Sequence, residues 1–279
     1  MTPRRDLQRR VSVLLDTAEC CTTPLGAGEL HWQRWSGPAA GSPLVLIHGG
    51  FGSWNHWFAN LDALRRQREL WTLDLPGLGA SGPLDRHAGP QDIARAVASG
   101  LRQLLGSRDY ELAGFSFGAM VGARLAADSH CRRLTAIGAA GCGSLHVQVP
   151  LQRPPRPDTP WELAAPIHRA NLRALMFSPE GAIDELAVHL HADNLARARF
   201  NSRGLSLTGD FLDALSGIHG ELVAVWGSAD ATAGGAAAIE ARRQLIARHQ
   251  PGARCHVLPG PGHWTMYEAP ERINALLLS

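Results

Sequence analysis

The sequence lacks the features that mark several large classes of protein. Lysine and arginine exceed aspartate and glutamate by only two charges, so no strong field directs the chain to nucleic acid or to acidic lipid. The apolar run at residues 11–15 ends at Asp16, too short for a signal-peptide core or a membrane span, and no other run approaches a spanning length. No internal repeat or low-complexity tract is present. We therefore expect a globular protein with neither a nucleic-acid nor a membrane partner.

Cysteine is scarce and shows no functional spacing. The five cysteines are Cys20, Cys21, Cys131, Cys142 and Cys255. None of them lies at the spacing of a metal site or a redox motif. An odd number with two adjacent members suits a reduced interior better than a secreted disulfide framework. We therefore expect a cytoplasmic protein with no metal centre.

The chain does contain short apolar runs that alternate with helical patterns. The apolar runs, each typical of a strand, cover residues 44–47, 69–73, 109–113, 134–138, 222–226 and 255–258. The helical patterns cover residues 92–105, 119–127, 236–248 and 270–278. An antiparallel hairpin at residues 20–36, with a turn at 26–28, precedes them. This alternation predicts an α/β fold with a mainly parallel sheet around one large core.

One long segment breaks this alternation. Residues 143–217 contain no apolar run of the strand type. They open with a proline-rich stretch at 150–160 and continue with helical patterns at 165–176 and 183–200. We predict a helical insertion that lies over the sheet.

Ser116 lies between two glycines at the corner where a predicted strand meets a predicted helix. The segment 114–118 reads Gly-Phe-Ser-Phe-Gly, the pattern of a nucleophile elbow. The turn is so sharp that the serine backbone is strained, and side chains at positions 114 and 118 would clash. The strain points the hydroxyl out of the sheet, which makes Ser116 the candidate nucleophile.

A serine hydroxyl needs a base to take its proton and an acid to orient that base. His263 follows the last predicted strand directly, in a glycine-rich turn from which a loop reaches across the strand ends. Asp230 follows the preceding strand, in the turn Gly-Ser-Ala-Asp. The segment 137–142, the other place sometimes used for the acid, contains no carboxylate. We predict His263 as the base and Asp230 as the acid.

A tetrahedral intermediate also needs backbone N–H groups to hold its oxyanion. One comes from the residue after the nucleophile, Phe117, and the other from the loop that begins at His48. The glycines of that loop allow a close approach, and the N–H of either Gly50 or Phe51 suits the role. His48 is expected to hold the loop structurally. Asp74, in the turn 74–81, is expected to accept hydrogen bonds from loop backbone.

Together these motifs resemble the α/β-hydrolase superfamily from about residue 20 to the C-terminus. The matching segments are 48–50, 74–81, 114–118, 227–230 and 262–263. The resemblance implies an α/β-hydrolase fold, a mostly parallel eight-stranded sheet flanked by helices, with residues 1–142 and 218–279 as its core domain. It implies residues 143–217 as a helical cap, inserted after the strand that follows the nucleophile helix. It also implies Ser116, Asp230 and His263 as a catalytic triad.

Within the superfamily, the segment 262–268 is similar to the meta-cleavage-product hydrolases, which break a carbon–carbon bond in vinylogous diketone acids. Trp264 directly after His263 carries this similarity. That family usually has an asparagine before the nucleophile, where this chain has Phe115, which cannot hydrogen-bond the dienoate oxygens. It also has a cap arginine that holds the substrate carboxylate, where a rough alignment places Leu190 or His191. In this chain three arginines follow closely downstream, at positions 197, 199 and 203.

These departures favour an ester or a related acyl substrate. We expect a largely apolar pocket lined by Phe115, Trp264 and Trp54, with His191 as a polar member. The sequence predicts a cofactor-independent serine hydrolase that acts through an acyl-enzyme on a small-to-medium hydrophobic substrate. Carbon–carbon cleavage stays open as an alternative, and so does a catalytically silent ligand-binding scaffold, because a fold does not fix a function. The expected partner is a small-molecule substrate, and a homodimer is a further possibility.

Overall fold

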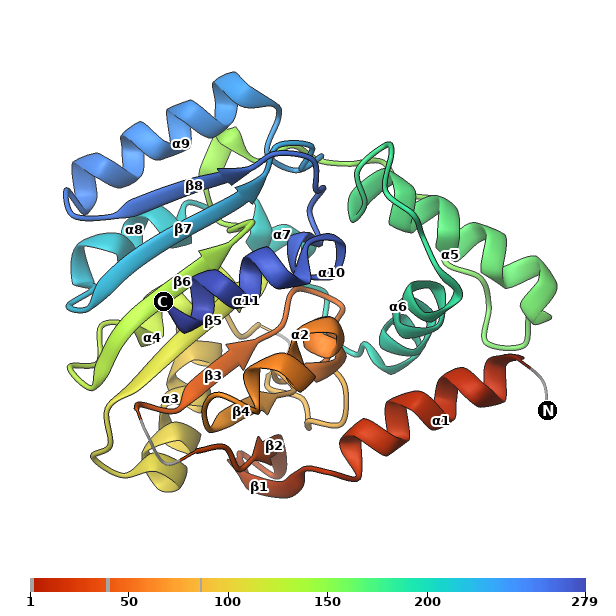
Figure 1. Ribbon diagram of the computed structural model, residues 1–279, viewed down its shortest axis with the longest axis horizontal. Coiled ribbons are helices and arrows are strands. Elements are labelled where there is room, and N and C mark those ends of the chain that lie inside the picture. Colours follow the sequence, from red (N-terminus) through yellow and green to blue (C-terminus); the bar gives the residue numbers. More distant parts are fainter. Residues whose placement is uncertain (1–2, 39–40, 86) are drawn as a thin grey trace.

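The strands form a single sheet. The computed structural model describes residues 3–38, 41–85 and 87–279, and within them eight strands pair in the order β1-β2-β4-β3-β5-β6-β7-β8 (Figure 1). The strands are β1 (Glu19–Leu25), β2 (Gly28–Trp35), β3 (Leu44–Ile47), β4 (Leu70–Leu73), β5 (Tyr110–Phe115), β6 (Cys131–Ile137), β7 (Glu221–Gly227) and β8 (Arg254–Leu258). β2 pairs antiparallel with β1 and β4, and all other neighbours are parallel. The mainly parallel eight-stranded sheet predicted from the sequence is confirmed.

Helices cover both faces of the sheet. The α-helices of the described residues are α1 (Pro3–Leu15), α2 (Phe58–Leu64), α3 (Pro90–Leu105), α4 (Phe117–Leu125), α5 (Trp161–Leu175), α6 (Glu185–Arg197), α7 (Arg203–Ser206), α8 (Asp210–Ala214), α9 (Ala236–His249), α10 (Thr265–Glu268) and α11 (Pro270–Leu278). Buried residues of α3, α4, α8 and α9 belong to one hydrophobic cluster, and those of α2 and α11 to a second. The sheet therefore has a separate hydrophobic core on each face.

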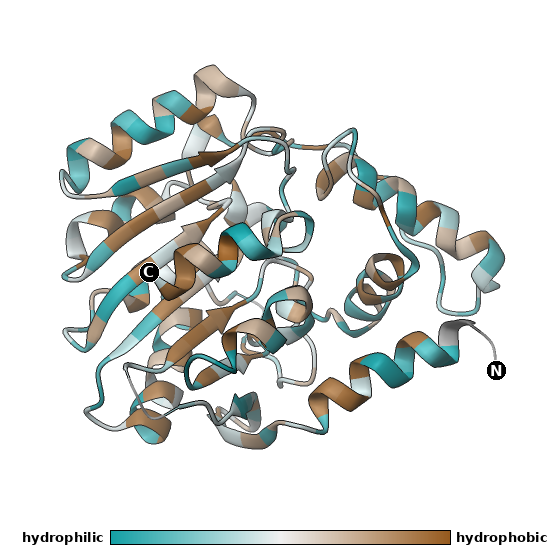
Figure 2. Ribbon diagram, in the orientation of Figure 1, coloured by the Kyte–Doolittle hydropathy of each residue, from teal (hydrophilic) through white to brown (hydrophobic). Residues whose placement is uncertain are grey.

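Alternation along the central strands explains the two cores. In β3, Leu44 and Leu46 join the second cluster, whereas Val45 and Ile47 join the first. Successive side chains of a strand point to opposite faces, so a strand covered on both faces must be apolar throughout. Figure 2 shows this as hydrophobic colour along most of the central strands, whereas the surrounding helices alternate between the two extremes.

In the segment between β6 and β7, α5 and α6 lie beyond the ends at which the β6, β7 and β8 arrows point, whereas α8 packs beside α4 on one face of the sheet (Figure 1). The residues of this segment, all of them described, contain α5 to α8 and no strand. α5 begins at Trp161, four residues before the helix predicted there, and α6 begins after Asp184, whose carboxylate accepts the N–H of Ala187 at 2.8 Å. We call residues 143–217 the helical insertion; its role as a cap stays a prediction.

α1 has no counterpart in the sequence analysis. It packs beside α6 of the helical insertion, and its Leu14 is buried in the same cluster as Leu172 and Leu190. Most of the other residues of α1 are polar, so the stability of this helix depends on the apolar edge that carries Leu14. Among the described residues, no helix combines the length and the apolar character that a membrane crossing requires.

Leu112 of β5 tests the first core. Its side chain is fully buried, so Leu112→Ala leaves a cavity and should lower the free energy of unfolding by about 2–5 kcal/mol. The matched control is Leu278→Ala, at a leucine that is 42% exposed, which should cost less than about 0.5 kcal/mol. Urea denaturation measures both. Equal losses in the two variants would contradict the assignment of Leu112 to the core.

Candidate active site

Ser116 occupies the sharp corner between β5 and α4. Its φ of 53° and ψ of −113° place a residue with a side chain in a strained conformation. A methyl group on Gly114 would lie 2.5 Å from the Gly118 carbonyl oxygen, and one on Gly118 would lie 2.3 Å from the His48 carbonyl oxygen. The corner therefore has the strain, and the need for both glycines, that the sequence predicted.

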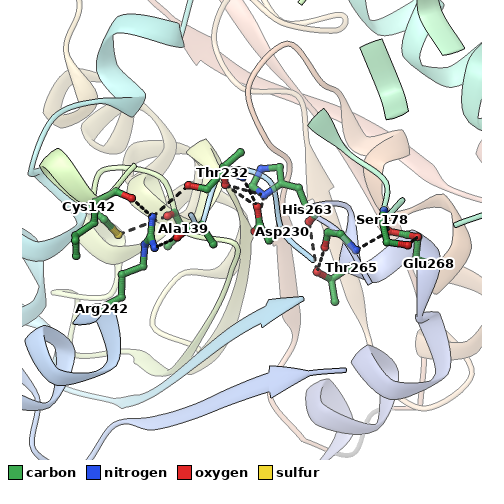
Figure 3. A network of polar contacts seen from close by, with 12 residues as sticks. Ala139, Cys142, Ser178, Asp230, Thr232, Arg242, His263, Thr265 and Glu268 are labelled. Atoms are coloured by element: carbon green, nitrogen blue, oxygen red, sulfur yellow. Dashed lines mark hydrogen bonds and ion pairs between the residues drawn. The ribbon is translucent and has the colours of Figure 1, made fainter. Parts of the chain in front are cut away.

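Asp230 and His263 meet at the ends of β7 and β8. Asp230 lies three residues beyond β7, and His263 lies in the loop between β8 and α10. The imidazole Nδ1 lies 2.8 Å from a carboxylate oxygen of Asp230, and each residue is only 3% exposed (Figure 3). Thr232 supports the carboxylate, because its N–H and its hydroxyl both donate to the other Asp230 oxygen at 2.8 Å. Asp230 and His263 are thus buried, and Asp230 is held by His263 at one carboxylate oxygen and by Thr232 at the other.

The surroundings of Asp230 keep it ionised. Burial alone would raise its pKa, but the neighbouring His263, and hydrogen bonds from His263 and Thr232, hold the pKa of the carboxyl below its ordinary value. An ionised Asp230 accepts a hydrogen bond from Nδ1–H of His263, so the proton stays on Nδ1 and Nε2 keeps its lone pair. Thr232 was not predicted from the sequence as a residue of the site. The Asp-x-Thr spacing is nevertheless typical of an aspartate turn, in which the side chain accepts the N–H two residues on.

Ser116 and His263 share their neighbours. The N–H of Ser116 donates to Ile137 at 2.8 Å, and a methyl group on the adjoining Gly138 would lie 3.0 Å from the His263 ring. On another side, the rings of Phe115 and His263 have centroids 4.9 Å apart. Among the described residues, no hydrogen bond joins the Ser116 hydroxyl to His263. The structure therefore brings the two into one site, and proton transfer between them stays a prediction.

The loop after β3 packs directly on the nucleophile corner. Phe117 is the first residue of α4, where a backbone N–H has no partner within the helix. Phe51 has a positive φ of 53°, which is uncommon for a residue other than glycine. A methyl group on Gly50 would lie 2.3 Å from the Ser202 hydroxyl, so a side chain here would require that hydroxyl to turn away. These features fit an oxyanion site, with the choice between Gly50 and Phe51 still open.

His48 and Asp74 have the structural roles expected of them. The fully buried His48 contacts the Gly49 carbonyl oxygen through Nδ1 at 2.7 Å and accepts the Leu75 N–H at Nε2 at 2.8 Å. Asp74 accepts the N–H groups of Trp54 and Ala80, each at 2.8 Å. Burial lowers the pKa of His48 to about 4, opposed by its hydrogen bond to Gly49. Both side chains hold backbone in place.

His56 is a member of the site that the sequence analysis missed. Its Nδ1 accepts the Gly49 N–H at 3.2 Å, so the ring proton is on Nε2. Its ring centroid lies 5.4 Å from that of Phe115 and 5.3 Å from that of Trp264. Burial lowers the pKa of His56 well below its usual range, and the nearby His48 adds to this. A polar residue between two tryptophans, just after a glycine-rich loop, was the available signal.

The three aromatic residues predicted to line the pocket are all buried in the second core. Phe115 and Trp264 lie around His56 and His263, and Trp264 donates its indole N–H to the His56 carbonyl at 2.8 Å. The Trp54 ring instead neighbours that of Trp35, with centroids 6.1 Å apart. Contact of any of these side chains with a substrate stays a prediction.

His191 projects from α6 of the helical insertion. Its ring lies edge-on to that of His168, at 5.5 Å. Burial, with the neighbouring His168, lowers the pKa of His191 to about 3. One turn further along α6, the Asn194 side chain accepts from the Ser53 hydroxyl and donates to Asn55, each at 2.8 Å. This face of α6 therefore meets the loop after β3.

Comparison with known proteins agrees with the geometry. The model of the alpha/beta hydrolase family matches residues 44–276. The chain is 30% identical, over 91% of its length and 67% of the relative, to a dihydrolipoyllysine-residue acetyltransferase component of an acetoin cleaving system from Pseudomonas putida. It is 26% identical, over 84% of its length and 86% of the relative, to a 2-hydroxy-6-oxononadienedioate/2-hydroxy-6-oxononatrienedioate hydrolase from the same species. A Bacillus subtilis carboxylesterase structure, 19% identical, superposes with a TM-score of 0.70 over 99% of this chain and 97% of its own.

Fold and site thus define a hydrolase of the α/β type. The chain belongs to the alpha/beta hydrolase family, as its resemblance to that superfamily implied.

The buried His48 makes a testable contribution to the pH dependence of stability. The unfolded chain takes up a proton there near pH 6.5 and the folded protein only near pH 4, so the free energy of unfolding falls as the pH is lowered through this window. One such proton contributes a slope of up to about 1.4 kcal/mol per pH unit. Urea denaturation between pH 7.5 and 4.5 should therefore show a shallower slope for His48→Gln than for the wild type. His249→Gln, at an exposed histidine, is the control; a slope for His48→Gln equal to that of the wild type would refute the contribution.

Proposed function

We propose that the protein is a cofactor-independent serine hydrolase that cleaves a hydrophobic carboxylic ester or a related acyl substrate. The observation that carries the proposal is the buried contact of 2.8 Å between His263 Nδ1 and Asp230, placed beside the strained corner of Ser116. A strained serine and a histidine oriented by a carboxylate are the parts that acyl transfer requires.

In the proposed mechanism, Ser116 attacks the substrate carbonyl while His263 takes the hydroxyl proton. The N–H groups of Phe117 and of Gly50 or Phe51 hold the oxyanion of the tetrahedral intermediate. His263, stabilised by Asp230, then protonates the leaving group, and an acyl-enzyme forms. Water activated by His263 attacks this intermediate and releases the acid. Each proton taken from a nucleophile is returned to a leaving group, so the cycle is balanced.

The surroundings of the site favour a substrate that carries no carboxylate group. Burial keeps His56 and His191 neutral, so neither offers a positive charge. Of the arginines downstream of His191, Arg197 pairs with Asp193 and Arg199 donates to the carbonyls of Gly79 and Ser81. Both of these guanidinium groups are already engaged, and the third arginine, Arg203, is exposed on α7. An ester, which is neutral, needs no cationic partner.

Carbon–carbon cleavage is the second candidate, supported by the named activity of the 26% identical Pseudomonas putida relative. Phe115 argues against it, because its ring lies between His56 and His263 and offers no hydrogen bond to a dienoate oxygen. The 30% identical acetyltransferase component adds acyl transfer to the chemistry found among relatives. Acyl chemistry at Ser116 therefore remains the first proposal.

Ser116→Ala removes the proposed nucleophile. Turnover of p-nitrophenyl butyrate by the purified variant should fall about a thousandfold or more, since no other group can form the acyl-enzyme. Labelling with a fluorophosphonate probe, read by mass spectrometry, should modify Ser116 in the wild type only. Wild-type turnover by the variant would disprove the nucleophile, and an unlabelled wild type would indicate a binding scaffold.

The two candidate reactions are separated by a direct comparison of substrates. We expect kcat/KM for small aryl esters to exceed that for a ring-fission dienoate by about tenfold or more, because Phe115 cannot stabilise the dienoate oxygens. Spectrophotometric assays of both substrates with one enzyme preparation measure the ratio. A higher kcat/KM for the dienoate would reverse the order of the two proposals.

A further inference from the structure

The loop that carries His263 is held from the side of the sheet by the turn after β7. The Ala229 N–H donates to the Pro261 carbonyl at 3.0 Å, and the Gly260 N–H donates to the Ser228 hydroxyl at 2.9 Å. Ser228 and Ala229 directly precede Asp230 in the chain. We call residues 259–264 the base loop. These two contacts fix the distance between the base loop and Asp230, but they involve only the first half of the loop, at Gly260 and Pro261.

The second half of the base loop is held by the helical insertion. The Trp264 N–H donates to the Met176 carbonyl at 2.7 Å. A methyl group on Gly262 would lie 2.5 Å from the backbone nitrogen of Ser178, so the two backbones are in direct contact. The Tyr267 hydroxyl donates to Asp184 at 2.8 Å. The insertion therefore forms the second wall around His263.

The Glu268 carboxylate joins these two backbones. Glu268 is the last residue of α10. One of its carboxylate oxygens accepts both the Gly262 N–H at 2.7 Å and the Ser178 N–H at 3.0 Å. Its other oxygen accepts the Ser178 hydroxyl at 2.7 Å (Figure 3). A single carboxylate thus binds the residue before His263 and a residue 90 positions away in the chain from Glu268.

We propose that Glu268 is a positioning residue that couples the helical insertion to the base loop, so that the orientation of His263 depends on where residues 176–178 lie. The proposal rests on the proposed function, in which His263 is the base. Gly262 has no side chain to anchor it, and its N–H donates to the Glu268 carboxylate. The base loop also meets the insertion through the Trp264 N–H bond to Met176 and through the edge-on contact of the Phe177 and Trp264 rings, whose centroids are 6.0 Å apart. Loss of Glu268 therefore removes the partner of the Gly262 N–H and the link from this peptide to Ser178, while the Gly262 carbonyl keeps its hydrogen bond from the Thr265 hydroxyl. The insertion acts here as part of the catalytic support as well as a cover.

The test compares variants of Glu268 that keep or remove its hydrogen bonds. In Glu268→Gln the amide oxygen can accept both N–H groups, and the amide nitrogen can donate to the Ser178 hydroxyl. Glu268→Leu has a similar volume but accepts nothing. Glu268→Asp keeps the charge on a shorter stem, which cannot reach both backbones, and it serves if the leucine variant does not fold. Glu271→Gln, at an exposed position in the first turn of α11, is the control.

We expect Glu268→Leu to lower kcat for p-nitrophenyl butyrate, and the rate of fluorophosphonate labelling of Ser116, by about 10- to 100-fold with little change in KM, because a displaced base slows chemistry. Glu268→Asp should show a smaller loss of the same kind. Glu268→Gln should stay within about threefold of the wild type. The control should match the wild type.

Amide hydrogen exchange gives a readout that does not depend on activity. In Glu268→Leu, exchange should become faster in peptides covering residues 174–182 and 259–266, and should be unchanged in β7. A variant that unfolds more easily but keeps wild-type kcat and labelling rate would overturn the positioning role. Faster exchange in the base loop alone would overturn the coupling to the insertion. If Ser116→Ala retained activity, the proposed function would fail instead, and the exchange result would still report on the coupling.

Discussion

The geometry of the site depends on one strained residue. Ser116 has a φ of 53°, and this is tolerated because β5 on one side and α4 on the other fix the chain before and after it. The strain requires glycines at 114 and 118, and the absence of their side chains lets the carbonyl of His48 come close to the corner. The loop after β3 can then reach the serine. One unfavourable backbone conformation thus determines which segments can surround the hydroxyl.

The second constraint is the cost of burying a charge. Asp230 is almost fully enclosed, and an unpaired carboxylate there would be strongly destabilising. The charge interaction with His263, and hydrogen bonds from His263 and Thr232, compensate this burial, which is why the pKa of Asp230 lies below its ordinary value. The same bonds orient His263. The arrangement that makes Asp230 tolerable in the core is therefore the one that fixes the orientation of the imidazole.

The sequence predicted the parts of the fold that depend on local pattern. The run at β3 is apolar throughout because both of its faces are covered, and the turns carrying Ser116, Asp230 and His263 follow strands directly. α1 was missed because its helix gains its stability from contact with α6, which no local pattern reveals. The bonds between Glu268 and Ser178 were missed for a similar reason, since these residues are 90 positions apart in the chain. Long-range hydrogen bonds leave little trace in a single sequence.

Charge at the site follows from the same limits on burial. Of the histidines around the corner, His48, His56 and His191 all have pKa values lowered by desolvation, so at neutral pH they act as neutral donors and acceptors. In the proposed mechanism His263 gains a positive charge, and the ionised Asp230 beside it compensates that charge. These neutral histidines supply no positive charge to a substrate anion, and for this reason the proposed function favours a neutral acyl group.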